Sequence, residues 1–229
     1  MKWTLFVALI FSGFRLSAQS VSVSSRAIYD FFFIDNNPRL DFENIALTDG
    51  KLFEYEHSLG DYKVALGYMN NYNHIYVPVV NDSFYSLFGN TISRSHVLSL
   101  SVNKMYILYG KLSFGWSAVL RGVWINRIWE DSDNCNIVQL DRKDYQACNN
   151  LTAYTGFKIE PSANIFFDFA FLDRMHMYIY IGITKGFSRY QEMEVRYRYK
   201  GIDQESVTSY TNGTGLYFGT GLKFDIVEN

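Results

Sequence analysis

Residues Gly215–Ile226 read GLYFGTGLKFDI, and this stretch decides how the chain folds. Large apolar side chains stand at alternate positions, at Leu216, Phe218, Leu222 and Phe224. The positions between them carry glycine, tyrosine, lysine and aspartate. A helix would need an apolar stripe of period 3.6, and each interior glycine would cost it about 1 kcal/mol. The stretch therefore predicts a β-strand with one apolar face and one small or charged face.

The same alternation recurs along the chain, at residues 62–69, 96–103, 111–121 and 192–199. Several of these segments reach the roughly 9–11 residues that a tilted strand needs to cross a bilayer. Tyrosine, tryptophan and phenylalanine gather near the segment ends, as in the aromatic girdles of membrane barrels. A soluble β-sandwich shows the same alternation and stays open as the alternative. Length and aromatic placement favour a membrane barrel.

Composition excludes several classes of protein. The 229 residues carry 21 Lys and Arg against 23 Asp and Glu, and this near-neutral charge argues against a nucleic-acid partner. A content of 19 Phe, 18 Tyr and 4 Trp argues against disorder. A mean hydropathy of −0.09 is too low for a bundle of membrane-spanning helices. What remains is a chain rich in amphipathic strands.

The N-terminus has the pattern of a secretory signal peptide. Lys2 precedes an apolar run from Trp3 to Phe14, and Leu16-Ser17-Ala18 follows as a cleavage site. The run is too short for a membrane-spanning helix, which needs about 20 apolar residues. We therefore expect residues 1–18 to be removed on export and residues 19–229 to form a single β-barrel domain.

The pattern predicts about ten strands. Eight is the alternative, since single-chain bacterial barrels have an even number of strands. The expected strands are 22–34, 51–59, 62–72, 93–103, 111–124, 150–160, 163–172, 175–184, 187–199 and 214–227. Short turns are expected on the periplasmic side at Gly60-Asp61, around Pro161 and at Lys185-Gly186. The longer connections 35–50, 73–92, 125–149 and 200–213 are then expected on the outer side.

In these features the chain resembles the small bacterial outer-membrane β-barrel proteins of the broad OmpA/OmpW-like kind, over the whole of residues 19–229. The resemblance implies a closed, antiparallel, up-and-down transmembrane barrel in the bacterial outer membrane. It also implies contact with membrane lipid and lipopolysaccharide, and insertion by the barrel-assembly machinery. Family members engage that machinery through a closing strand that ends in an aromatic residue. Here the alternation of apolar residues is present, but residues 226–229 read IVEN and include no aromatic residue.

A barrel in hydrocarbon has no free edges, because every backbone N–H and C=O needs a partner within the sheet. Leu216, Phe218, Leu222 and Phe224 are expected to face lipid. The other face of the strands carries charges of both signs, which we expect to form ion pairs that fill the lumen. This set comprises Glu54, Glu56, Lys63, Arg121, Asp168, Glu192, Glu194, Arg196, Arg198, Lys223 and Asp225.

Cys135 and Cys148 both lie in the expected outer connection 125–149. Exported proteins fold in an oxidising compartment, which favours a disulfide between them. A pair of metal-binding thiolates is the alternative.

Motifs for catalysis are incomplete. His57, His74, His96 and His176 show no HxH, HxxxH or HExxH spacing. Gly186–Tyr190 lacks the second glycine of a nucleophile elbow, and Asp131-Ser132-Asp133 opens a calcium loop that no glutamate closes. We therefore expect no catalytic residue, metal or cofactor, and a structural, binding or small-solute pore role. A membrane-embedded lipid-modifying enzyme and a soluble secreted β-sandwich binding protein are the alternatives.

Overall fold

The computed structural model describes residues 20–35, 45–81, 84–127, 134–140, 143–203 and 206–226. The expected signal peptide, residues 1–18, lies outside the described residues. The described part of the chain forms twelve β-strands. None of it forms a helix that is long and apolar enough to cross a membrane.

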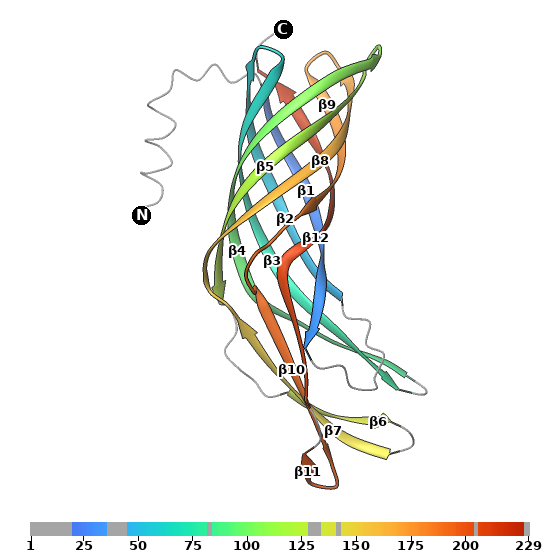
Figure 1. Cartoon of the computed structure of the whole chain (residues 1–229). Helices are drawn as coiled ribbons and strands as arrows, with labels where there is room; N and C mark the ends of the chain where they lie inside the picture. The colour runs from blue at the N-terminus through green and yellow to red at the C-terminus, as the bar shows by residue number, and fades with distance from the viewer. Residues whose placement is uncertain are drawn as a thin grey trace.

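Eight strands form a closed antiparallel barrel, in which β1 pairs with β2 on one side and with β12 on the other (Figure 1). The wall strands are β1 (Ser20–Asp35), β2 (Ile45–Leu59), β3 (Tyr62–Asn81), β4 (Phe84–Tyr109), β5 (Leu112–Arg127), β8 (Gly156–Leu172), β9 (Met175–Thr184) and β12 (Val207–Asp225). The closed antiparallel barrel expected from the sequence is thus confirmed. Of the two strand numbers considered, eight is the one that closes the wall.

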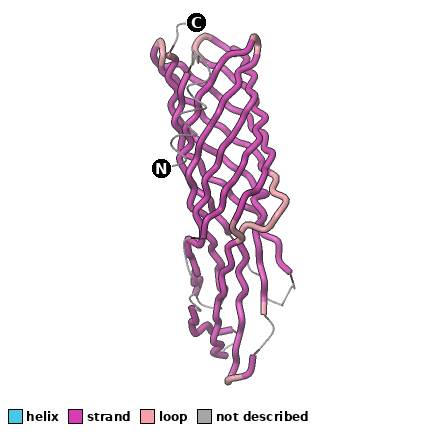
Figure 2. The backbone as a smooth tube through the Cα atoms, turned by 90° about the vertical axis from the view of Figure 1, so that its left-hand side faces the viewer, coloured by secondary structure: helices cyan, strands magenta, loops and turns pink. Residues whose placement is uncertain are grey.

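The remaining strands lie beyond one end of the barrel (Figures 1 and 2). They are β6 (Asn134–Leu140), β7 (Lys143–Ala153), β10 (Gln191–Tyr199) and β11 (Ile202–Asp203). The strand β12 links the two parts, because it pairs with β9 from Gly215 to Phe224 and with β10 from Val207 to Thr211. We call β6, β7, β10, β11 and residues 207–211 the strand extension.

The barrel ends differently at its opposite pole. Tight turns at Gly60-Asp61, Gly110-Lys111 and Asp173-Arg174 join consecutive wall strands there. We call this the short-turn end, and β12 also ends there, at Asp225 (Figure 1).

The register fixes the tilt of the wall strands. A line of paired residues leaves β4 at His96, crosses each wall strand once and returns to β4 at Tyr106, ten residues away. The line passes through Asn70, Lys51, Ser25, Thr220, Ile179, Phe167 and Phe114. A stagger of this size over eight strands tilts them by about 40° from the barrel axis, within the range usual for barrels.

One expected turn is wrong: Pro161 lies inside β8, where it pairs with Leu120 of β5. The expected strands 150–160 and 163–172 therefore do not exist as two wall strands. The Pro161 carbonyl accepts a hydrogen bond from Lys185 N at 3.0 Å, so the backbone of Pro161 faces β9. Pairing with β9 begins only at Ser162, opposite Thr184. The missing N–H of proline therefore falls at the end of the β8–β9 ladder, opposite Lys185, rather than in its interior.

Because β8 runs through Pro161 as one strand, the connections after it lie at the opposite ends of the barrel from those expected. The turn at Asp173-Arg174 lies at the short-turn end, and Lys185-Gly186 lies at the other end, where the chain leaves β9 for the strand extension. The expected strand 187–199 becomes β10, outside the barrel wall. The expected connection 73–92 is largely strand, since β3 runs on to Asn81 and β4 starts at Phe84.

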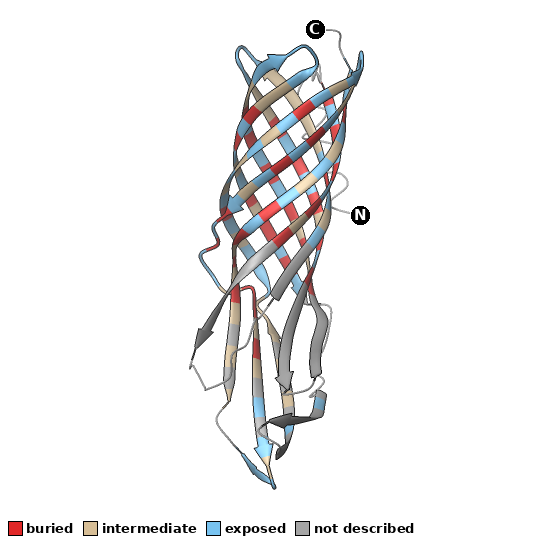
Figure 3. Ribbon diagram, turned by 90° about the vertical axis from the view of Figure 1, so that its right-hand side faces the viewer, coloured by how far each residue is buried: buried red, intermediate tan, exposed pale blue. Residues whose placement is uncertain are grey.

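Burial alternates along the wall strands, as Figure 3 shows. On β12, Leu216, Phe218, Leu222 and Phe224 are 38–48% exposed, whereas Tyr217 is 1% exposed. The first set points outward and the second points into the lumen, so the period-two pattern of the sequence is the inside–outside pattern of the barrel.

Candidate functional site: the barrel lumen

A charge cluster occupies the lumen near the short-turn end. The Lys223 ammonium on β12 lies 2.6 Å from Asp168 Oδ2 on β8 and 4.0 Å from Glu56 Oε1 on β2. Lys63 Nζ on β3 lies 3.0 Å from the same Glu56 oxygen. Four strands thus contribute to one network, and the Lys223 side chain is only 9% exposed. Buried charges of this kind persist only when they are paired, which fixes the relative positions of the strands.

His176 extends this cluster along β9. Its Nδ1 lies 2.6 Å from Asp168 Oδ1, and its Nε2 lies 3.1 Å from Asp225 Oδ2. Asp168 therefore meets both Lys223 and His176, and the cluster reaches the last residue of β12. His176 has no motif around it in the sequence, and only the pairing of β9 with β8 and β12 places it here.

A stack of aromatic and guanidinium groups lies deeper in the lumen. The Arg26 guanidinium carbon lies 3.6 Å from the centroid of the Tyr217 ring, and that of Arg121 lies 4.6 Å from the same centroid. Arg121 is 1% exposed, and its Nη1 lies 3.9 Å from Glu160 Oε2. Tyr180 packs edge-on against Tyr217, with ring centroids 6.0 Å apart. Contacts of this type stabilise a desolvated cation by about 2 kcal/mol.

Glycines on the inward face make room for these rings. A Cβ at Gly182 would lie 2.6 Å from Tyr217 Cζ, and one at Gly219 would overlap the Tyr180 ring. A Cβ at Gly115 would overlap Phe166 in the same way. Each ring therefore fills the space that a glycine on another strand leaves, as expected for the narrow interior of an eight-stranded barrel.

The far end of the lumen is filled by apolar side chains together with small polar ones, among them Asn71, Asn73 and Ser95. Leu52, Met69, Val97, Val123, Ile125 and Tyr190 form one buried cluster. Gln191 and Met193 of β10 are each 1% exposed, so the first residues of the strand extension are buried as well.

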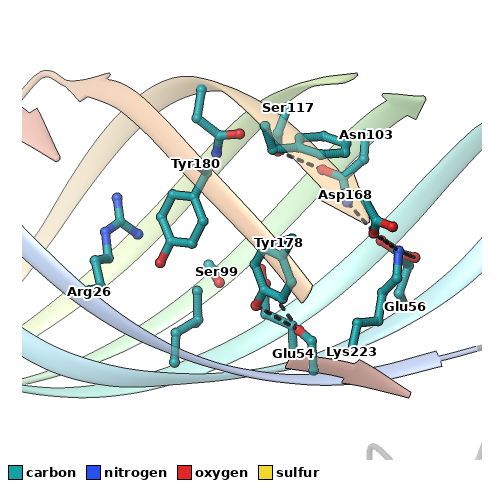
Figure 4. A pocket seen from close by; sticks show the side chains of 14 residues that line it. Arg26, Glu54, Glu56, Ser99, Asn103, Ser117, Asp168, Tyr178, Tyr180 and Lys223 are labelled. Carbon is teal, nitrogen blue, oxygen red and sulfur yellow. Dashed lines mark hydrogen bonds and ion pairs between the residues drawn. The ribbon is translucent and has the colours of Figure 1, made fainter. Parts of the chain in front are cut away.

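Small cavities remain in the described part of the lumen, among them the following two. The first has a volume of about 80 Å³. Figure 4 shows its lining, which includes Arg26, Glu54, Ser99, Tyr178 and Tyr180. The second, of about 20 Å³, lies among the far-end side chains beside Arg121 and Glu160. Both are far smaller than the channel of a wide porin.

The structure brings together part of the charged set expected in the lumen. Glu54, Glu56, Lys63, Asp168, Lys223 and Asp225 lie at or near the short-turn cluster, and Arg121 lies deeper, beside Tyr217. Leu216, Phe218, Leu222 and Phe224 lie on the outer surface.

The expectation was wrong for Glu192, Glu194, Arg196 and Arg198. All four lie on β10, which pairs with β7 and β12 beyond the barrel. Arg196 Nη2 donates to Glu194 at 2.7 Å, and Arg198 Nε donates to Asp203 at 2.7 Å. These hydrogen bonds lower the pKa values of Glu194 and Asp203. Alternation assigned β10 to the wall because an extension strand has the same period as a wall strand.

Other lumen residues were missed. Arg26 follows Ser20, Ser22 and Ser24 at alternate positions of β1, and all four are buried. That parity could have identified Arg26 as an inward cation. The sequence did not indicate Glu160 as a lumen residue, because the expected strand ended at Glu160, next to the expected turn at Pro161.

The disulfide expected from the sequence is present: Cys135 of β6 and Cys148 of β7 are bonded and occupy paired positions. It lies in the strand extension. Among the described residues, no group of three His, Cys, Asp or Glu side chains is arranged to hold a metal ion.

No protein-family model matches the chain, and no curated protein matches its sequence. Similar solved structures are bacterial outer-membrane barrels. The outer membrane protein OprG from Pseudomonas aeruginosa shares 6% identity, with 90% of this chain and 95% of OprG covered and a TM-score of 0.47. Neisserial surface protein A shares 7%, with 91% and 98% covered and a TM-score of 0.41. The TodX monoaromatic hydrocarbon channel shares 8% identity, with 93% of this chain and 92% of TodX covered and a TM-score of 0.31. Such low similarity supports no inference about function, which must come from the barrel itself.

Proposed function

We propose that this chain is an outer-membrane β-barrel that does not conduct solutes and that anchors the strand extension as a binding surface outside the cell. Membrane lipid and lipopolysaccharide would surround its wall, and the barrel-assembly machinery would insert it. The proposal assigns it no catalysis and no cofactor.

The height of the outer apolar band supports a place in a membrane. The ten steps along β4 from His96 to Tyr106, tilted by about 40°, rise about 25 Å along the barrel axis, which is the height of the apolar band of outer-membrane barrels. Between these ends, Leu98, Leu100 and Val102 are 40–51% exposed, and the ammonium of Lys104 on the same face lies over the Tyr62 and Tyr106 rings. So much exposed apolar surface is unusual for a soluble monomer.

Aromatic pairs mark the two limits of this band. Tyr106 and Phe114 stack with centroids 5.9 Å apart, and Trp124 and Phe157 pack with centroids 4.6 Å apart. The first pair lies at the Tyr106 end of the register line and the second beside its His96 end. Rings at both limits match the girdles found where barrels meet the membrane–water interfaces.

The filled lumen is the observation that carries the non-conducting role. The Lys223 network closes the short-turn end, the Arg26–Tyr217–Arg121 stack crosses the middle, and apolar and small polar side chains close the far end. A hydrated ion would have to displace paired charges and packed rings along most of its path.

Planar-bilayer recording tests this role. The folded wild-type protein is expected to give no stable single-channel steps. Tyr217→Ala, which removes the central ring of the stack, is expected to give small, measurable conductance. Tyr72→Ala, on the outer surface, serves as the control and is expected to behave like the wild type. Stable steps from the wild-type barrel would refute the non-conducting role and favour a pore.

Surface labelling tests the orientation. Lys200 lies at the tip of the strand extension and Lys111 lies in a short turn, and both are exposed. A membrane-impermeant amine reagent applied to intact cells is expected to modify Lys200 and to spare Lys111, as read by mass spectrometry. Modification of Lys111 with protection of Lys200 would reverse the assigned orientation.

A further inference from the structure

Arg26 is a buried cation with incomplete hydrogen bonding. It is 5% exposed, and its Nε and Nη2 atoms make no hydrogen bond within the described residues. The register places glycines on both sides of it, Gly50 on β2 and Gly219 on β12, and the Asn71 side chain and the Tyr180 ring occupy the space that these glycines leave. Tyr217 contacts the guanidinium through a ring face, which neutralises no charge. A buried guanidinium in this state needs a further partner.

Glu54 is a lumen carboxylate with weak compensation. Its Oε2 accepts a hydrogen bond from Ser22 Oγ at 3.5 Å. No ion pair joins it to a lysine, arginine or histidine of the described residues, since Lys223 approaches Asp168 and Glu56 instead. Glu54 pairs in register with Ser22, four residues along β1 from Arg26. Four residues span about 13 Å of strand, so the two side chains project from well-separated backbone positions.

Arg26 and Glu54 line the same cavity, whose volume is about 80 Å³. Tyr178 and Tyr180 also line it, and Figure 4 shows both rings projecting into the space that separates the two charged side chains. Ser24 bonds the Tyr180 hydroxyl at 3.2 Å, and the Tyr178 hydroxyl donates to Ser22 at 3.2 Å, which fixes both rings.

We propose that this cavity binds one small zwitterion. Its carboxylate lies against the free N–H groups of Arg26, and its cationic nitrogen lies toward Glu54 and the faces of Tyr178 and Tyr180. The guanidinium offers a planar donor pair to a carboxylate, and tyrosine rings with a carboxylate attract an ammonium or quaternary nitrogen.

The two charges together select the ligand class. A lone anion at Arg26 would leave Glu54 with only its Ser22 hydrogen bond and the more distant charge of Lys223. A lone cation at Glu54 would leave Arg26 without an opposite charge. Water satisfies hydrogen bonds but supplies no opposite charge. A zwitterion compensates both groups at once and keeps the net charge of the lumen unchanged. This inference goes beyond the proposed function and does not depend on what the strand extension binds.

Calorimetric titration of the detergent-folded, full-length protein tests the inference. The probes are glycine, a small zwitterion that carries both charges, acetate and methylammonium. Glycine is expected to bind with one-to-one stoichiometry, and each single-charge probe is expected to bind at least about tenfold more weakly. Arg26→Gln and Glu54→Gln are each expected to weaken glycine binding by about tenfold or more, because each removes one charged partner.

Lys51→Gln is the control, since it removes one cation from the exposed, outward face of β2 and Lys51 does not line the cavity. It is expected to leave glycine affinity unchanged. A gel comparing unboiled with boiled samples establishes that each variant is folded, so a loss of binding is separated from a loss of the barrel. No glycine binding by the folded wild type would overturn the inference. So would equal affinity for acetate, or glycine affinity that neither cavity variant changes.

Discussion

At the scale of the residue, neighbours in sequence have opposite surroundings. Phe218 is 48% exposed on the outer wall. The next residue, Gly219, points into the lumen, where the Tyr180 ring occupies the space that a larger side chain would need. The effect of a substitution on stability therefore depends first on whether its side chain points outward or into the lumen. Outward positions tolerate apolar bulk, and inward positions tolerate only what the lumen has room for.

Phe218→Arg is expected to destabilise the folded barrel by about 2–4 kcal/mol, because it places a charge on the apolar band. The measurement is urea unfolding in lipid vesicles. Tyr109→Arg is the depth control: Tyr109 ends β4 at the short-turn end and is 86% exposed, so a cost of about 0–1 kcal/mol is expected. Equal costs at both sites would contradict the outer band as the lipid contact.

Gly182→Ala is expected to destabilise the barrel by about 1–3 kcal/mol, because the new methyl group would overlap the Ala163 carbonyl oxygen and crowd Tyr217. Gly122→Ala provides the comparison. Its Cβ would meet only the Phe157 ring at short range, and Phe157 is 52% exposed and can turn outward. Unfolding of both variants in vesicles measures the difference, and a larger cost at Gly122 would refute the packing of the lumen described above.

At the scale of the element, one strand can serve two parts of the molecule. β12 closes the barrel against β1 and β9, and its first residues pair with β10 in the strand extension. The extension is thus continuous with the wall rather than a loop attached to it. Within it, the disulfide joins β6 to β7 at residues 13 positions apart.

Replacing Cys135 and Cys148 by serine is expected to loosen the extension and leave the barrel folded. A disulfide that closes a loop of this length contributes about 3 kcal/mol on the chain-entropy model. Limited proteolysis is expected to cut the β6–β7 hairpin faster in the double variant. The heat-dependent gel shift of the barrel is expected to match that of the wild type. Loss of the gel shift would show that barrel folding depends on the disulfide.

At the scale of the whole molecule, the lumen network joins strands that are distant in sequence. Lys223 lies between carboxylates of β2 and β8, so β12 is held to both sides of the barrel. This arrangement makes closure of the wall and pairing of the charges mutually dependent.

Lys223→Met is expected to destabilise the barrel by about 3–5 kcal/mol, because it leaves Asp168 and Glu56 buried with less compensation. Lys63→Met is expected to cost about 1 kcal/mol, since Lys63 is more exposed and pairs with one carboxylate in the network. Denaturant midpoints in vesicles compare the two. Similar small losses for both would indicate that water, rather than Lys223, compensates the carboxylates.

The sequence by itself determined the class of fold and the faces of most wall strands. Alternation is a local property, and the pleat of any strand converts it directly into two faces, as β12 shows. The Cys135–Cys148 pairing was equally accessible, because the two residues are close in sequence.

Only the tertiary structure decided which strands close the wall and which side chains meet inside it. Pro161 read as a turn because local sequence does not show that β9 has ended beside it. The sequence predicted β10 as a wall strand, because extension strands and wall strands have the same period-two pattern. Only the strands with which β10 pairs distinguish it from the wall. The contacts of Arg26 with Tyr217 and of Lys223 with Asp168 depend on the register around the closed ring. Register joins residues that are far apart along the chain, so no local pattern encodes it.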